Sequence, residues 1–159
     1  MRNRFASRLV SVALFAAVAS AAIARSSAGE PSAAAGRPTV RLDRLDFPTD
    51  LPGHVRFERH LRTVLRHEAR RADWGAGRNN TIEYRFSVDR LDLSAEGEVL
   101  RVECTATGRL PGGKSARSKL RFSGEPAARN QLVERVLDIV ARGVVTRLAA
   151  LERKRRGLE

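Results

Sequence analysis

The sequence has a single cysteine, Cys104, so the chain cannot close a disulfide within itself. Aromatic residues make up only 5% of the chain, so the interleaved basic and aromatic residues typical of a single-stranded nucleic-acid site are missing. Lysine is almost absent, since nearly all of the 30 basic residues are arginine. Such an excess of arginine, together with many alanines, is typical of a GC-rich genome. The net charge of +12 therefore favours anionic neighbours without indicating nucleic acid.

The sequence also lacks an apolar run long enough to cross a membrane as a helix, which takes about 20 residues. The run from Leu9 to Ile23 has 15 residues, follows three arginines and ends in small residues where a signal peptidase would cut. We therefore expect residues 1–24 to be a cleaved signal peptide. The mature chain would then have no transmembrane span and would be periplasmic or secreted. A retained N-terminal anchor is the alternative.

The remainder of the chain divides into three parts. Residues 25–38 are small residues with proline and glycine, typical of a flexible linker. Residues 39–152 have the size of one domain, large enough to bury a core without disulfides. Residues 153–159 form a basic C-terminal tail. Loss of residues 1–24 would remove three arginines and no acid, leaving a net charge of +9.

Hydropathy alternates with a period of two in four segments and follows a helical period in two others. Strands are predicted at 39–47, 81–93, 99–108 and 116–122, with a possible bulge in the first and a change of phase near Arg90. An amphipathic helix is predicted from Val55 to Ala72, with Asp50 as an acidic cap and Pro52 in the first turn, and a second helix opens at Ser123–Pro126.

The order β-α-β-β-β-α predicts an α+β fold, a two-layer sandwich with both helices on one face of the sheet. The last three strands form an antiparallel meander, because short turns join them. The first strand reaches the sheet across a helix, so it pairs parallel to another strand or lies at an edge. Each strand is apolar on one side only, which indicates one packed and one solvated sheet face.

Residues Gly108 to Ser115 fit the phosphate-loop pattern G-x-x-x-x-G-K-[ST]. A phosphate loop needs a helix directly after it, whose N-terminus holds the phosphates. Residues 116–122 alternate with a period of two instead, and Pro126 follows too soon for a helix between them. The segment is therefore interpreted as a glycine-rich hairpin turn, and no cofactor is predicted.

No other pattern predicts catalytic or metal-binding residues. The spacing of His54, His60 and His67 does not place two of them within reach of one metal ion. Cys104 lies on the inward side of its strand, which predicts a buried thiol. Asn79–Thr81 matches the sequence pattern for N-glycosylation, but the composition is typical of a prokaryotic protein, so we expect no glycosylation there.

Arginines recur along one side of the first predicted helix, opposite its apolar face. Such a surface attracts anionic lipid head groups, acidic polymers or an acidic partner. A solvated helix face with no function is the alternative. The candidate anion-binding residues are Arg56, Arg59, Arg66 and Arg70.

Three features resemble small exported proteins of unknown function from GC-rich Gram-negative bacteria. They are the alanine-rich leader, the Tyr84-x-Phe86-x-Val88 strand with the lone cysteine in the strand after it, and the long terminal helix. The layout is also similar to the N-terminal domain of TolB and the periplasmic domain of LpoB, which belong to accessory and scaffold proteins without an active site.

The resemblance implies a non-enzymatic accessory or binding protein of the cell envelope. Its partner would be a protein or an anionic envelope component, and nucleic acid is disfavoured. An anion-binding module for an envelope polymer or lipid is the second hypothesis, and a small enzyme of unrecognised type is the third.

Overall fold

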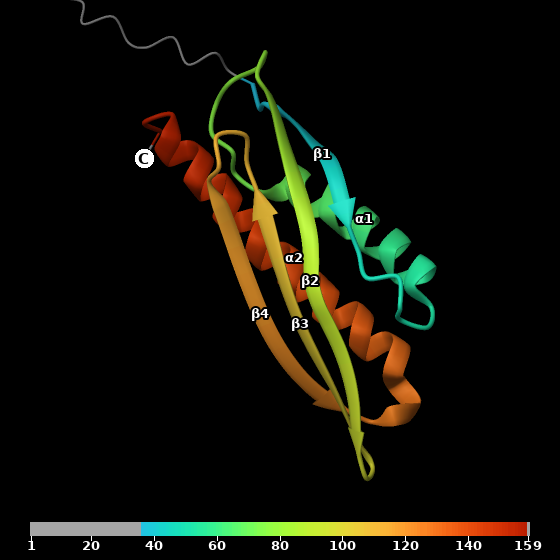
Figure 1. Cartoon of the computed structure of the whole chain (residues 1–159). Coiled ribbons are helices and arrows are strands. Elements are labelled where there is room, and N and C mark those ends of the chain that lie inside the picture. Colours follow the sequence, from blue (N-terminus) through green and yellow to red (C-terminus); the bar gives the residue numbers. More distant parts are fainter. Residues whose placement is uncertain (1–35, 159) are drawn as a thin grey trace, which may run out of the picture. The chain divides into compact units, whose positions relative to one another are not determined.

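The computed structural model describes residues 36–158. The elements are β1 (Thr39–Asp46), α1 (His54–Arg71), β2 (Thr81–Glu96), β3 (Val99–Arg109), β4 (Ser115–Gly124), the 3-10 turn η1 (Pro126–Ala128) and α2 (Arg129–Arg155). One sheet has the strand order β1-β2-β3-β4, and both helices cover the same face of it (Figure 1). The predicted α+β sandwich is confirmed. The predicted signal peptide and most of the predicted linker lie outside the described residues.

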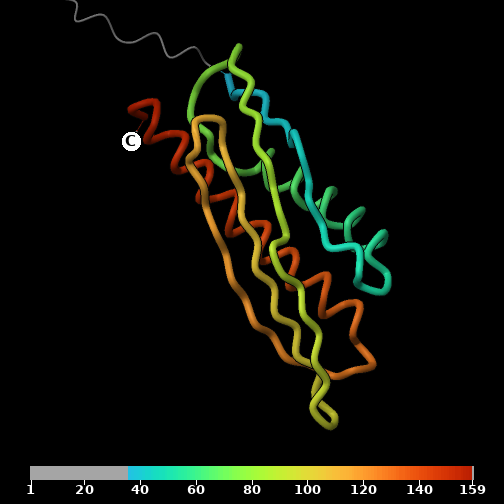
Figure 2. The backbone as a smooth tube through the Cα atoms, viewed as in Figure 1, coloured from blue at the N-terminus to red at the C-terminus, as the bar shows by residue number. Residues whose placement is uncertain are grey.

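The sheet is mixed. β1 runs parallel to β2, whereas β2, β3 and β4 form an antiparallel meander. β1 pairs only with the first half of β2, from Thr81 to Ser87, so β2 and β3 extend well past the end of β1 (Figure 2). The register shifts between Leu42 and Arg44 and again after Val88, the two places where the alternation of the sequence changes phase.

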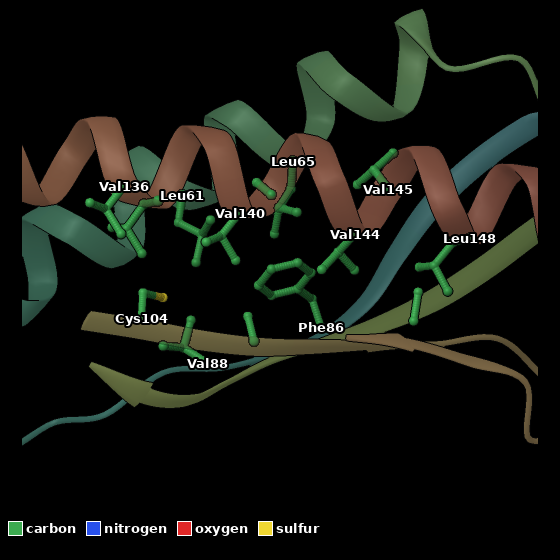
Figure 3. Packing of buried hydrophobic residues seen from close by; sticks show 14 of the residues in the cluster. Leu61, Leu65, Phe86, Val88, Cys104, Val136, Val140, Val144, Val145 and Leu148 are labelled. Carbon is green, nitrogen blue, oxygen red and sulfur yellow. The ribbon is translucent and has the colours of Figure 1, made fainter. Parts of the chain in front are cut away.

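The core lies between the sheet and the helices. Side chains of α2, including Val136, Val140 and Val144, point toward the strands, where they meet Phe86 and Cys104 (Figure 3). Burying each large apolar side chain contributes about 1.5–3 kcal/mol. Among the described residues this core spans Val40 to Leu151. The domain thus has a core of its own, as an independently folding unit requires.

One close approach sets the distance between α2 and the sheet. A Cβ on Gly108 would lie 2.5 Å from Cγ1 of Val144 and 2.7 Å from Cδ1 of Leu148. The first glycine of the phosphate-loop pattern is therefore explained by packing, because only a residue without a side chain lets α2 lie this close to β3.

The element ends differ from the predicted ones. α1 begins at His54, after Gly53 in a left-handed conformation (φ 86°), and no side chain caps it. Pro126 starts η1, and α2 begins three residues later, also without a side-chain cap. The predicted cap at Asp50 is thus wrong, because buried faces rather than caps hold these helices in place. Residues 153–155 belong to the last turn of α2.

Candidate anion-binding site

The four candidate arginines of α1 do not form one patch. Arg56 leans toward α2, where its Nε donates to Oε1 of Glu134 at 2.9 Å. Arg59 is exposed on the outer side of α1. Arg66 and Arg70 border β1 on the other side of the helix. The structure therefore brings together only half of the set that the sequence predicts.

A hollow of about 330 Å³ lies between α1 and β1. Three arginines spaced four residues apart line it along α1: Arg62, Arg66 and Arg70. Arg41 of β1 also lines it, and the apolar part of the lining comes from both elements and from β2, through Val40, Leu42, Ala69 and Tyr84. The hollow therefore combines a basic rim with an apolar floor.

A second hollow of about 350 Å³ lies at the C-terminal end of α1 and shares Val40, Ala69 and Arg70 with the first. Arg37 lines it, and Nη1 of Arg37 donates to the backbone oxygen of Arg70 at 3.4 Å. We refer to the two hollows together as the α1–β1 groove. Its basic residues are Arg37, Arg41, Arg62, Arg66 and Arg70, and its apolar residues include Val40, Leu42, Ala69, Trp74 and Tyr84.

Trp74 belongs to this groove although it comes from a loop. It is 3% exposed, its ring lies 6.2 Å from that of Tyr84 between centroids, and its Nε1 donates to the backbone oxygen of Ala69 at 2.8 Å. The glycine and asparagine content predicts a loop here but gives no signal that the tryptophan folds back onto α1. Arg37 was missed for a similar reason, because it lies in the predicted linker.

Few carboxylates compensate the positive charge of the groove. Within residues 36–158, Glu58 pairs with Arg62 at 2.8 Å, whereas no carboxylate lies within ion-pair distance of Arg66 or Arg70. Asp73 is the acidic residue that lines the groove, and it forms an ion pair with Arg153. The Gly75 backbone N–H, and then Arg153 and Arg37, hold the pKa of Asp73 below its usual value. The groove is therefore strongly basic at neutral pH.

The basic residues of β4 are, by contrast, largely compensated. Lys119 and Arg121 lie on the solvated sheet face, and both pair with Glu103, at 2.8 and 2.6 Å. Their hydrogen bonds lower the pKa of Glu103 to about 2. This face of the sheet is a ladder of ion pairs rather than a free basic surface.

The phosphate-loop match is a hairpin turn, as predicted. The backbone N–H of Leu110 donates to the backbone oxygen of Lys114 at 2.8 Å, and Gly112 and Gly113 have positive φ angles of 89° and 85°. β4 follows directly, so the turn does not lead into the helix N-terminus that would bind phosphate.

Cys104 is fully buried, which confirms the predicted inward thiol, and burial raises its pKa to about 12. Nε2 of His60 lies 2.7 Å from Oδ1 of Asp138, joining α1 to α2. Within residues 36–158, no group of three or more histidine, cysteine or acidic residues could hold a metal ion. None of the helices in that range is long and apolar enough to span a membrane.

The sequence matches no protein-family model and none of the curated protein sequences. The fold is similar to a putative lipoprotein from Caulobacter crescentus CB15, at 12% identity over 74% of this chain and 92% of that chain, with a TM-score of 0.43. Rare lipoprotein B from Shewanella oneidensis is 14% identical over 74% of this chain and 98% of its own, with a TM-score of 0.43. The PelC dodecamer from Paraburkholderia phytofirmans is 14% identical over 72% of this chain and 92% of the PelC chain, with a TM-score of 0.40. Similarities this distant carry no functional argument, and the chain is assigned to no family.

Proposed function

We propose that this chain is an exported, non-enzymatic protein of the cell envelope that binds an anionic envelope component in the α1–β1 groove. The observation that carries the proposal is the row formed by Arg62, Arg66 and Arg70. Residues four apart on a helix are separated by about 6 Å along its axis, so the row presents a regular line of positive charge. Such a line attracts anionic head groups and acidic polymers. The predicted signal peptide supports the envelope location.

The test compares two double charge reversals that change the net charge equally. Arg66→Glu with Arg70→Glu reverses the rim of the groove, and neither arginine loses an ion pair within the described residues. Arg109→Glu with Lys114→Glu makes the same change at the β3–β4 hairpin, where both side chains are exposed. Binding is measured to phosphatidylglycerol vesicles, with phosphatidylcholine vesicles as the neutral reference.

A basic residue near an anionic surface contributes about 1 kcal/mol, so loss of two should weaken vesicle binding about thirtyfold. The hairpin variant should bind nearly as well as the wild type. Equal losses in the two variants would mean that binding follows total charge, and the proposal would be wrong. Absence of wild-type binding to anionic vesicles would contradict it as well.

A protein partner is a second candidate, and the free edge of β4 favours it. This strand has ten residues without a bulge or proline, and such an edge can accept a strand of another chain. Nη1 of Arg147 donates to the backbone oxygen of Arg117 at 2.6 Å, which occupies one position of that edge. A single envelope protein captured by the wild type, and lost when proline replaces Lys119 on the same edge, would support this candidate over anion binding.

A further inference from the structure

We infer that the α1–β1 groove binds an anionic amphiphile, with the anionic head group at the arginines and an aliphatic chain along the apolar floor. This inference rests on the proposed function and names the ligand class for the same site. A phospholipid and a free fatty acid share the required chemistry, which is one anionic head joined to an aliphatic chain.

The floor of the groove is more apolar than an anion alone requires. Val40 and Leu42 lie on the edge strand β1 and stay half-buried, because α1 does not cover them fully. A hydrophilic anion would contact the arginines and leave these side chains in water. An aliphatic chain would remove the same carbon surface from water, at about 25 cal/mol per Å².

The aromatic residues Trp74 and Tyr84 lie beneath the floor of the groove, where they are 3% and 1% exposed. The hydroxyl of Tyr84 donates to the backbone oxygen of Leu65 at 3.3 Å, and Nε1 of Trp74 donates to that of Ala69 at 2.8 Å. Since both polar groups are already used within the protein, the rings add no free hydrogen-bonding group to the floor. The apolar surface that a ligand can reach therefore comes mainly from Val40 and Leu42, which are half-buried.

The size and charge of the groove fit the same ligand class. Its two hollows, of about 330 and 350 Å³, share lining residues and fall within the range of about 300–1,000 Å³ that small-molecule sites have. A neutral aliphatic ligand would leave Arg66 and Arg70 without a counter-charge. An anionic amphiphile provides that counter-charge and covers the floor at once.

Three probes separate the contributions of head and chain: dodecyl phosphate, inorganic phosphate and dodecyl maltoside, each below its micelle concentration. Binding to residues 25–159, which contain the whole described core, is measured by isothermal titration calorimetry. We expect saturable binding of dodecyl phosphate, no measurable binding of dodecyl maltoside, and binding of inorganic phosphate at least about a hundredfold weaker than that of dodecyl phosphate. Shortening the chain from dodecyl to octyl should weaken binding by about tenfold or more, since a fully buried methylene contributes about fourfold.

Two variants place the binding in the groove. Ala69 lines both hollows, so Ala69→Leu fills the floor and should weaken dodecyl phosphate binding about tenfold while leaving the arginines in place. Ala150→Leu makes the same change on an exposed position of α2 and should have no effect. If Ala69→Leu lowers the melting temperature, Val40→Thr replaces a methyl group by a hydroxyl on the floor and should weaken binding about threefold.

The outcomes distinguish this inference from the proposed function. Inorganic phosphate binding as tightly as dodecyl phosphate would overturn the amphiphile and leave the anion site intact. Tight binding of dodecyl maltoside would overturn both, because charge would then play no part. Unchanged dodecyl phosphate binding in both floor variants, or no binding by the wild type, would also overturn the inference.

Discussion

At the scale of single residues, two glycines at the same helix–sheet interface differ in whether the structure has room for a side chain. A Cβ on Gly108 of β3 would collide with Val144 and Leu148. A Cβ on Gly143 of α2 would meet only Oγ of Ser118, at 3.5 Å, which is an ordinary contact. The two glycines therefore provide a matched pair of substitutions for testing the packing.

Gly108→Ala should destabilise the domain by roughly 1–3 kcal/mol, because the added methyl group overpacks a closed interface. Gly143→Ala should stabilise it by about 0.5–1 kcal/mol, because alanine loses less backbone freedom in a helix than glycine does. Urea denaturation of both variants measures the two free energies of unfolding. Changes of the same sign would contradict the close approach of α2 to β3.

Cys104→Ser should lower the free energy of unfolding by about 1–3 kcal/mol, since it buries a hydroxyl among apolar neighbours. The native thiol should also resist alkylation at pH 9, because burial raises its pKa to about 12 and keeps it protonated. Iodoacetamide labelling with and without urea measures this. Labelling of the folded protein at the rate of a free thiol would show that Cys104 is accessible.

At the scale of elements, the C-terminus of α2 is fastened to the loop between α1 and β2. Glu152 is 4% exposed and accepts hydrogen bonds from Arg155 at 2.8 and 2.7 Å and from Arg156 at 2.9 Å. Arg156 in turn donates to the backbone oxygen of Ala76 at 3.1 Å. Arg155 first, and then Arg156, lowers the pKa of Glu152.

Glu152→Gln should therefore lower the free energy of unfolding at pH 7 by roughly 1.5–3 kcal/mol. A lowered pKa stabilises the folded state above the usual carboxyl pKa, and this stabilisation is lost as the pH falls through the folded value. The difference between wild type and variant should thus shrink steadily below about pH 4.5. Thermal melts across pH 2.5–7 measure it. Glu125→Gln, at an exposed position, is the control and should show a small, pH-independent effect.

Lys114→Ala should leave the free energy of unfolding within about 0.5 kcal/mol of the wild-type value, because the lysine is exposed in a hairpin turn. Equilibrium dialysis with ATP should detect no saturable binding in either protein. ATP binding that disappears in the variant would reinstate the phosphate-loop interpretation of Gly108–Ser115.

The sequence predicts the order of the elements well, because two-residue alternation and glycine-rich turns are local signals. The bulge in β2 is local too, since Leu91 and Leu93 visibly leave the phase of the preceding residues. Contacts between residues that are far apart in the sequence leave no such local signal. Nothing in the sequence shows that Trp74 folds back against Tyr84, or that Arg37 lies beside Arg70. The sequence therefore predicts arginines along α1, whereas it predicts neither their division between two sides of the helix nor the groove with its apolar floor.

At the scale of the whole molecule, the basic charge is unevenly compensated. On the solvated sheet face Glu103 pairs with both Lys119 and Arg121, whereas Arg66 and Arg70 have no carboxylate at ion-pair distance among the described residues. The net charge of the chain therefore does not show that these two surfaces differ in how far their basic residues are paired with carboxylates. Equal charge reversals at the groove and at the β3–β4 hairpin should have unequal effects on binding, because Arg66 and Arg70 line one hollow together.

The order of elements also decides when the chain can fold. α2 is the last element and provides eleven buried residues, against five from α1. Until α2 leaves the ribosome, most of the apolar face of the sheet has no cover, so the described domain cannot complete its fold before α2 is made. The predicted signal peptide implies passage through a translocase as an unfolded chain, and such a chain gains from this delay. The backbone oxygen of Gly36 accepts from Gly77, and the guanidinium of Arg156 reaches the same glycine, so a permutant that begins with α2 and joins these ends by a linker should keep the fold while having its largest apolar surface ready first. Such a permutant, made behind the predicted signal peptide, should fold earlier and be exported less completely.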